Sequence, residues 1–419
     1  MKALCISASA SNQGKTVLTT ALLYYFRKSV RPFKIGPDFI DPQFHQRVCE
    51  TPSINLDRYM MDKDELKWLF NNYSDKKISI CEGVMGFYDG HDKKSSAYDI
   101  SKLLNIPTLI LLDGSGSYIT VSALLKGLST YKKDNTIKGV ILNKIASPSH
   151  YELIKKVIEN DFKNIKVLGW IKKGIESLSE THLGLDLKDL GKIEKISQEV
   201  LEHIDIKKLE KIAKVEKKIK VKYPFEKMPK QNKKLAIVND ENFSFLYYDN
   251  LVFLKELFYE VVLVDSTIDE VIPDDTDIVY ICGGYVETNS AYEKVKNSHN
   301  FKNSLIKHAK DKTIYAECAG LLYLGKSVDD KVMSSILDVS FTKEKRFQRM
   351  GYYFNEDGIK GHAFHYTRPI DENSGFDRLS KSKDLIGKFG SWEKNRVFGT
   401  FLHSMFRGNI KLIKKRLLP

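Results

Sequence analysis

Short apolar runs alternate with segments of helical apolar spacing from residue 3 to residue 168, and this alternation limits the fold more than any other feature. The runs have the length and β-branched content of buried strands in a parallel sheet. Strand–helix alternation of this extent predicts a doubly wound α/β domain. The expected strands are Ala3–Ser7, Phe33–Ile35, Ile78–Cys81, Thr108–Leu112, Gly139–Leu142 and Lys166–Leu168, and the expected helices are Val17–Lys28, Asp64–Asn71, Tyr118–Tyr131 and His150–Asn160.

A lysine-rich stretch separates this pattern from a second α/β pattern. Residues 201–234 contain twelve lysines and five acidic residues, a net charge of +7, and their apolar residues lie near helical spacing before two prolines. We therefore expect domains at 1–200 and 235–419, joined by a basic helix and linker at 201–234. The strands expected in the second domain are Leu235–Val238, Glu260–Val264, Ile278–Ile281, Thr313–Ala316 and Arg396–Phe401.

The distribution of charge bears on the partners that this chain can have. Its 419 residues carry a formal net charge of +13, and the predicted linker holds more than half of that excess. The charge therefore gives little support to a nucleic-acid or membrane partner. The longest apolar stretch, Ile106–Leu112, is far shorter than the ~20 residues that span a bilayer. Five scattered cysteines without a CxxC pair fit a reducing cytoplasm.

A Gly-Lys-Thr sequence between the first strand and the first helix predicts a phosphate-binding loop. Backbone N–H groups at a helix N-terminus bind phosphate oxygens, and Gly14 would open that helix. Lys15 would add a charge on the outer phosphates, and the Thr16 hydroxyl would ligate Mg²⁺. Ser9 replaces the first glycine of the G-x-x-x-x-G-K-T pattern. Asn143, which follows a later strand, is either a nucleotide contact or a helix cap.

Acidic residues follow the second and third strands, at the sheet edge where doubly wound proteins bind their ligands. They are Asp38 and Asp41 after one strand and Glu82 and Asp89 after the next. Opposite a phosphate loop, Asp38 and Glu82 would hold Mg²⁺ together with Thr16. The alternative is that these residues form turns in loops. That alternative is weakest for Glu82, which directly follows an apolar strand and needs a partner if it is buried.

Near the C-terminus, a cysteine lies in a tight turn between a predicted strand and a helix. There Cys318 would meet the positive end of the helix dipole, which lowers the pKa of a thiol and favours the thiolate. His403 follows a late strand and would be the base. Gly283 and Gly284 would let backbone N–H groups approach a tetrahedral oxyanion. The alternative is a small buried cysteine without a chemical role.

Taken together, these motifs resemble the glutamine-dependent cobyrinic acid a,c-diamide synthase family, over nearly the whole chain and in the same domain order. The resemblance implies an N-terminal P-loop domain like that of dethiobiotin synthetase and a C-terminal class I-type glutamine amidotransferase domain. The matching segments are Lys34–Pro42, Glu82–Gly90, Leu178–Leu185 and Tyr315–Gly325, supported by Gly283–Tyr285, Gly361–Tyr366 and Gly399–His403.

The resemblance implies a carbon–nitrogen ligase that needs ATP and Mg²⁺ and amidates the a and c carboxylates of cobyrinic acid in cobalamin biosynthesis. Cys318, with His403 as base, would release ammonia from L-glutamine. ATP would phosphorylate each carboxylate before ammonia displaces the phosphate. The oxyanion and glutamine positions of the family are matched by Gly283, Gly284 and Ala319. The positions that handle substrate and intermediate are matched by Asp38, Phe39, Asp41, Glu82 and Asp89.

Alternatives exist inside and outside this family. Hydrogenobyrinic acid and nickel-sirohydrochlorin are polycarboxylate substrates that the motifs do not separate from cobyrinic acid. A partitioning or membrane-associated ATPase with a deviant P-loop belongs to a different class and leaves Cys318 and His403 unexplained. We expect a cytoplasmic enzyme with a corrinoid substrate, without a nucleic-acid or membrane partner, and with a homodimer as one option for its assembly.

Several residues depart from the family pattern. The phosphate loop carries Ala8 and Asn12 where glycine is usual, although asparagine can adopt the left-handed conformation. Phe39 replaces a tyrosine and so lacks the hydroxyl that would contact the substrate. Met405 stands two residues after His403, where class I amidotransferases have the carboxylate of their triad. The sequence therefore predicts a Cys–His dyad.

Overall fold

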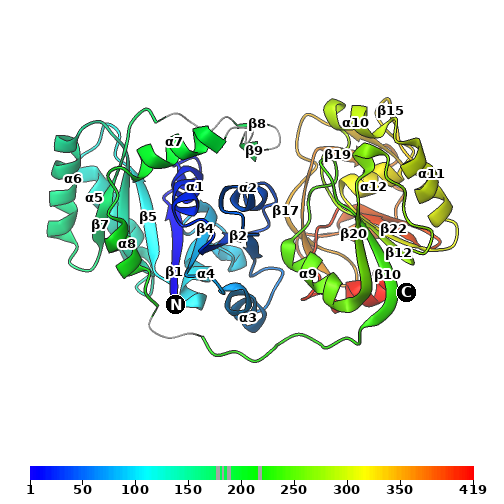
Figure 1. Ribbon diagram of the computed structural model, residues 1–419, viewed down its shortest axis with the longest axis horizontal. Helices are drawn as coiled ribbons and strands as arrows, with labels where there is room; N and C mark the ends of the chain where they lie inside the picture. The colour runs from blue at the N-terminus through cyan, green and yellow to red at the C-terminus, as the bar shows by residue number, and fades with distance from the viewer. Residues whose placement is uncertain (176–179, 182–183, 186–189, 216–218) are drawn as a thin grey trace. The chain divides into compact units, whose positions relative to one another are not determined.

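The computed structural model describes residues 1–175, 180–181, 184–185, 190–215 and 219–419. Its contacts divide the chain into two compact units, Met1–Pro224 and Phe225–Pro419 (Figure 1). The division falls inside the stretch predicted as a linker. Part of the family motif Leu178–Leu185, namely residues 178–179 and 182–183, lies outside the described residues.

The first unit is built on a parallel sheet of seven strands in the order β3-β2-β4-β1-β5-β6-β7. All six predicted strands are present, and each extends beyond its predicted bounds. A three-residue edge strand, β3, was too short to be recognised by its pattern. The strands are β1 (Lys2–Ala8), β2 (Val30–Ile35), β3 (Ile54–Leu56), β4 (Ile78–Gly86), β5 (Thr108–Asp113), β6 (Ile137–Ile145) and β7 (Lys166–Lys172).

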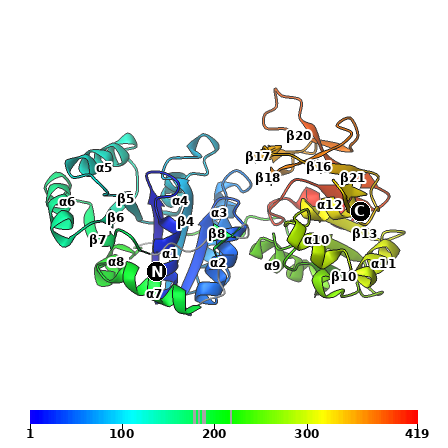
Figure 2. The same ribbon diagram turned by 90° about the horizontal axis from the view of Figure 1, so that it is seen from above.

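Helices cover both faces of this sheet, which explains why its strands are continuously apolar. The helices are α1 (Lys15–Tyr25), α2 (Ile40–Cys49), α3 (Lys63–Tyr73), α4 (Ala97–Leu104), α5 (Ile119–Tyr131), α6 (Pro148–Asp161), α7 (Leu190–Leu201) and α8 (Ile206–Ile212). Figure 2 shows α1, α7 and α8 on one face and α4 and α5 on the other. The backbone of two short strands, β8 (Glu180–Thr181) and β9 (Gly184–Leu185), forms a separate pair.

Residues 201–215 belong to the first unit, so the boundary predicted at residue 200 lies too early. The apolar side of α8 buries Leu209 in the same core as Ala213. The carbonyl of Ala213 accepts a hydrogen bond from the N–H of Ala3 at 2.8 Å, and the N–H of Val215 donates to the carbonyl of Met1 at 3.0 Å. The helical spacing in this basic stretch therefore reflects a packed domain face and not an exposed linker helix.

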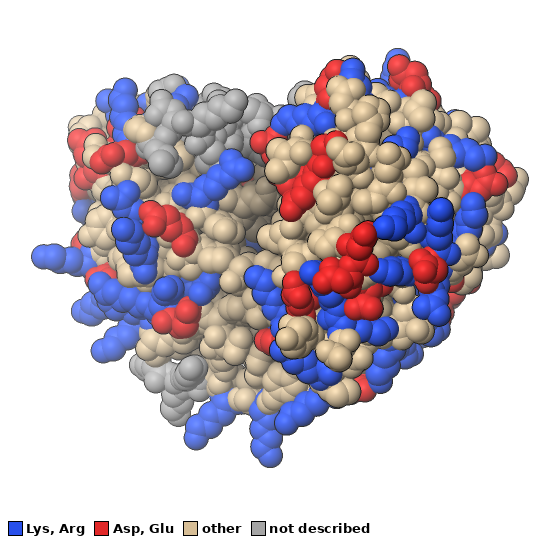
Figure 3. Space-filling view, turned by 45° about the vertical axis from the view of Figure 1, so that its right-hand side comes forward, with Lys and Arg blue, Asp and Glu red and all other residues tan. Residues whose placement is uncertain are grey.

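Basic and acidic side chains are interspersed on the molecular face seen in Figure 3. Pairs such as Lys2–Glu210 (3.0 Å) and Lys144–Asp113 (2.7 Å) place opposite charges next to each other. None of the helices in the described residues has the length and apolar content needed to cross a bilayer.

The second unit contains a sheet of seven strands in the order β11-β10-β12-β13-β22-β21-β20, in which the first five are parallel and the last two antiparallel. All five strands predicted for this domain are present. They and their neighbours are β10 (Gln231–Val238), β11 (Phe258–Val264), β12 (Ile278–Ile281), β13 (Thr313–Glu317), β20 (Asp377–Leu379), β21 (Lys388–Lys394) and β22 (Val397–Thr400).

Helices and smaller sheets complete the second unit. The helices are α9 (Tyr248–Leu257), α10 (Asn289–Val295), α11 (His299–His308), α12 (Ala319–Leu324) and α13 (Ile410–Leu412). A hairpin pairs β17 (Arg349–Phe354) with β18 (Lys360–His365), and a small sheet contains β14 (Ser327–Val328), β15 (Lys331–Val332), β16 (Ser340–Lys343) and β19 (Thr367–Pro369). The sheet and its helices share one continuous apolar core.

Candidate active sites

The loop between β1 and α1 has the backbone of a phosphate-binding loop. Gly14 has a φ of 91°, and a Cβ at this position would lie 2.7 Å from the Asn143 Nδ2 atom. Asn12 has a φ of 59°, so it adopts the left-handed conformation that the usual glycine would. Among the described residues, no side chain caps the N-terminus of α1. The N–H groups of its first turn are therefore suited to an anion.

Lys15 and Asn143 both reach this loop. The Lys15 ammonium donates to the carbonyl of Ala10 at 2.9 Å, and burial lowers the pKa of this lysine. The Asn143 side chain donates to the carbonyl of Gln13 at 2.9 Å. Because Asn143 lies inside β6, it does not cap a helix, and that alternative is wrong. Its amide instead braces the phosphate loop.

A buried lysine, Lys34, lies among the carboxylates that were predicted to bind metal. Lys34 on β2 is the register partner of Glu82 on β4, so both side chains leave the sheet on one face. The Lys34 Nζ atom is 3.3 Å from Glu82 Oε1 and 3.6 Å from Asp38 Oδ2, and it also pairs with Asp41. Burial opposes the charge, but these three carboxylates hold the pKa of Lys34 above its ordinary value.

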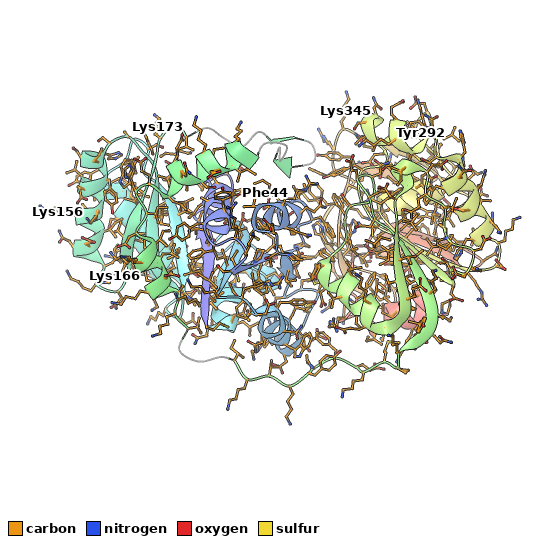
Figure 4. All side chains as sticks on the ribbon, in the orientation of Figure 1. Phe44, Lys156, Lys166, Lys173, Tyr292 and Lys345 are labelled. Carbon is orange, nitrogen blue, oxygen red and sulfur yellow. The ribbon has the colours of Figure 1, made fainter. Side chains whose placement is uncertain are left out.

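Glu82 lies within β4, fully buried, and has three partners. The Thr16 hydroxyl donates to its Oε1 at 2.8 Å, and the His45 Nε2 atom is 2.8 Å from its Oε2. Burial opposes ionisation, but Lys34 and His45 hold the pKa of Glu82 well below its ordinary value. On α2, the Phe44 side chain next to His45 packs into the core. The Lys156 side chain on α6, by contrast, points outward (Figure 4). Sequence reasoning did not identify Lys34 and His45 as parts of this site.

The remaining predicted residues combine turn roles with places beside the site. Asp38 Oδ1 accepts hydrogen bonds from the N–H groups that begin α2, at 2.8 and 3.3 Å. Asp89 Oδ2 accepts from the N–H of Gly86 at 3.0 Å, so both residues stabilise local turns. Burial raises the pKa of Asp41 to about 6. Phe39 is buried directly before α2.

Cys318 lies in a strained turn between β13 and α12. Its φ is 46° and its ψ is −104°, and its N–H donates to the carbonyl of Thr400 at 2.7 Å. The N–H of Ala319 contacts the thiol. Burial, reinforced by the nearby carboxylate of Glu287, raises the pKa of the Cys318 thiol above its ordinary value. This shift is opposite to the predicted lowering, because burial disfavours the charged thiolate.

Strand pairing brings His403 to the same sheet edge as Cys318. β13 and β22 are parallel neighbours, and the two residues follow their carboxyl ends. The backbone of His403 exchanges two hydrogen bonds with that of His362, at 2.9 and 2.8 Å. Two glycines, Gly283 and Gly361, leave room for His403. A Cβ on Gly283 would lie 2.2 Å from the His403 Cε1 atom, and a Cβ on Gly361 would lie 2.3 Å from the His403 carbonyl oxygen.

The chain after Gly283 is equally close to its neighbours. A Cβ on Gly284 would lie 1.9 Å from the carbonyl oxygen of Asn242, which accepts a hydrogen bond from the N–H of Tyr285 at 3.0 Å. The same segment continues to Glu287, whose Oε2 atom is buried and has no hydrogen-bond partner among the described residues. Burial raises the pKa of this carboxyl.

The imidazole of His403 contacts the carboxylate of a second glutamate, Glu317. The Oε2 atom of Glu317, the residue before Cys318, lies 3.3 Å from the His403 Nδ1 atom. Met405, at the position of the usual triad carboxylate, is buried. The sequence did not reveal this contact, because its two residues are 86 positions apart.

Comparison with known proteins accounts for both units. Residues 4–185 match the CobQ/CobB/MinD/ParA nucleotide-binding domain, and residues 234–410 match the CobB/CobQ-like glutamine amidotransferase domain. The chain is 36% identical to the cobyrinate a,c-diamide synthase of Caldanaerobacter subterraneus, over 98% of this chain and 95% of that protein. This chain belongs to the cobyrinate a,c-diamide synthase family. It is also 32% identical to the Listeria monocytogenes synthase (99% of this chain and 98% of that protein) and 33% identical to the Saccharolobus solfataricus synthase (97% and 98%).

Membership in this family confirms the resemblance that the motifs indicate, including the order of the two kinds of domain. A deviant P-loop partitioning ATPase would account only for the match at 4–185. It does not account for the amidotransferase domain at 234–410, so the alternative from a different class is set aside.

Proposed function

We propose that this protein uses ATP and L-glutamine to convert the a and c carboxylates of cobyrinic acid into amides. One observation carries the proposal: a single chain holds a phosphate loop beside a buried Lys34–Glu82 pair and, in its other unit, a cysteine and a histidine at one sheet edge. The first arrangement suits activation of a carboxylate, and the second suits release of ammonia from an amide. We expect the reaction to take place in the cytoplasm.

In the amidotransferase unit, Cys318 Sγ attacks the side-chain amide carbon of glutamine while its proton passes to His403. A base is needed because burial keeps the free thiol protonated. The N–H of Ala319 and the backbone at Gly283 and Gly284 stabilise the tetrahedral oxyanion. His403 returns the proton to the leaving ammonia, and water then hydrolyses the thioester to release glutamate.

Glu287 is suited to the α-ammonium group of the same glutamine. Glu287 lies on the segment that follows the two glycines, and its Oε2 atom is buried. Its carboxylate is close enough to Cys318 to raise the pKa of the thiol. A buried carboxylate oxygen without a partner is costly, and an ammonium group would satisfy it with a charge-assisted hydrogen bond. This contact would fix the amino-acid end of glutamine while its amide faces the thiol.

In the synthetase unit, Gly14 and Lys15 would hold the phosphates of ATP. The residues fit Mg²⁺ through oxygen atoms: the Thr16 hydroxyl and Glu82 Oε1 lie 2.8 Å apart beside the loop, and Asp38 contacts the same Lys34 ammonium as Glu82. No group of three or more His, Cys, Asp and Glu side chains in the described ranges could hold a metal ion alone. Phosphate oxygens would thus complete the shell, and the bound ion would offset phosphate charge.

Lys34 is placed to receive a carboxylate substrate. Its ammonium already faces three carboxylates, and the entering substrate would replace part of that contact. Asn143 would keep the loop in position, whereas Phe39, Asp41 and Asp89 would line the substrate side. Transfer of the γ-phosphoryl group gives an acyl phosphate, whose phosphate is a good leaving group. Ammonia then displaces it, which leaves an amide and inorganic phosphate.

Mass spectrometry of reaction mixtures tests the proposal. The purified protein is incubated with MgATP, glutamine and one of three macrocycles: cobyrinic acid, hydrogenobyrinic acid or nickel-sirohydrochlorin. Two successive carboxylate-to-amide conversions of cobyrinic acid, each coupled to ATP hydrolysis, are the expected result. If only another macrocycle is converted, that macrocycle is the substrate in place of cobyrinic acid. If none is converted, the proposed function is refuted. Light scattering of the same sample determines whether the protein is a homodimer.

A further inference from the structure

A histidine base needs a partner that fixes which of its ring nitrogens carries the proton. The residue two positions after His403 is Met405, which cannot accept a hydrogen bond from the ring in this way. Glu317 instead places its Oε2 atom 3.3 Å from Nδ1 of His403, and the side chains of this pair are 1% and 3% exposed. The contact is thus formed in the interior, where a carboxylate is retained only with partners.

We propose that Glu317 is the positioning residue of a Cys318–His403–Glu317 triad, which rests on the proposed release of ammonia from glutamine. The Nδ1–H group of His403 donates to Glu317, so Nε2 carries a lone pair that can take the Cys318 proton. Once the ring is protonated, the carboxylate stabilises the imidazolium. The triad therefore keeps the carboxylate of class I amidotransferases but takes it from the strand that leads to the nucleophile.

The fold explains how a residue on β13 can reach this ring. Glu317 is the register partner of Thr400, and the chain after Thr400 continues for three residues to His403. A side chain at the carboxyl end of β13 therefore lies beside the segment that carries the imidazole. The N–H of Ser404 is 3.5 Å from the Oε1 atom of Glu317, which gives the carboxylate a second contact with the same segment.

Two tyrosines hold the carboxylate from the other side. The Tyr280 hydroxyl donates to Glu317 Oε2 at 3.1 Å, and the Tyr315 hydroxyl donates to Oε1 at 2.9 Å. Tyr280 and Tyr315 are register partners on β12 and β13, and Tyr315 and Glu317 share a face because they are two residues apart. Each carboxylate oxygen thus has a donor fixed by the sheet, so Glu317 is held rigidly against the ring.

The Glu317→Gln variant of the full chain tests this role. Glutamine has the shape of glutamate and can accept from one tyrosine, but its NH₂ group can hold the unwanted tautomer of His403. We expect kcat for glutamine hydrolysis to fall about 10²-fold or more, with KM changed by less than about threefold. Amidation supplied with ammonium chloride should retain its wild-type rate, because it does not use Cys318. Glu293→Gln, an exposed change on α10, is the matched control and should leave both rates unchanged.

The pH profile separates a positioning role from a merely structural one. Glu317→Gln removes the carboxylate that is the counter-charge of a protonated His403. The acid limb of kcat/KM for glutamine should therefore move to lower pH in Glu317→Gln, and Glu317→Asp should keep the wild-type limb and recover part of kcat. If Glu317 only accepts hydrogen bonds from the two tyrosines, the acid limb of kcat/KM in Glu317→Gln would stay at the wild-type pH.

Three results decide the proposal. A glutamine-dependent kcat in Glu317→Gln within about threefold of wild type would overturn it. If Glu317→Gln loses both activities, Glu317→Asp decides: retained ammonium-dependent activity with a lowered glutamine kcat supports the triad, and loss of both activities overturns it. Release of glutamate by the wild-type protein is measured first. Its absence would refute the proposed function, which is a separate result from any difference between variants.

Discussion

Replacing Gly283 by alanine is expected to disable the glutamine site without touching the synthetase site. The added Cβ would lie 2.2 Å from the His403 Cε1 atom, whereas ordinary van der Waals contact begins at 3.4 Å. The imidazole would therefore have to move by about 1.2 Å, the difference between these two distances. A misplacement of about 1 Å at a reacting group can cost about 10²-fold in rate, which corresponds to about 2.7 kcal/mol.

The assay compares two nitrogen donors with one protein preparation. We expect Gly283→Ala to lower kcat with glutamine about 10²-fold and to keep the rate with ammonium chloride. The backbone N–H of residue 283 is retained in this variant, so the loss would come from the displaced ring. Gly127→Ala is the matched control, because a Cβ at Gly127 would meet nothing within 4 Å. A kcat with glutamine within about threefold of wild type would refute the assigned place of His403.

Three further predictions concern other groups. Lys15→Ala should abolish ATP-dependent amidation with either nitrogen donor and leave glutamine hydrolysis intact in a glutamate-release assay, since the lysine serves only the phosphates. Glu287→Gln should raise KM for glutamine about tenfold or more with a smaller change in kcat, and an unchanged KM would remove it from the glutamine site. The pKa of Asp41 is about 6 in the folded chain, whereas its ordinary value is 3.8. Between pH 3.8 and pH 6 the folded chain therefore keeps a proton on Asp41 that the unfolded chain releases. The free energy of unfolding of the first unit should therefore fall as pH rises from about 4 to about 6, by up to about 3 kcal/mol in urea titrations. Asp41→Asn should remove that fall.

The fold and the two loops could be predicted because their signals are local in sequence. Strand length and β-branched content identify β1 or β12 without reference to other segments, and Gly14 to Thr16 form the junction between the loop after β1 and the start of α1. The same holds for Cys318, which lies in a strand–turn–helix sequence. Such features depend on neighbouring residues alone.

What could not be predicted depends on pairing between distant segments. Lys34 meets Glu82 only because β2 lies beside β4, and Glu317 meets His403 only because β13 lies beside β22. The pKa of Cys318 was wrongly expected to fall, because a sequence shows the helix that follows a thiol but not the depth at which the thiol is buried.

The contact between the start of β1 and the chain after α8 has a consequence for synthesis. Met1 and Ala3 hydrogen-bond with Val215 and Ala213, which are made more than two hundred residues later. The first unit therefore cannot be complete until residue 215 has left the ribosome, although its last long strand, β7, ends at Lys172. During that interval the apolar surface that α8 later covers stays exposed.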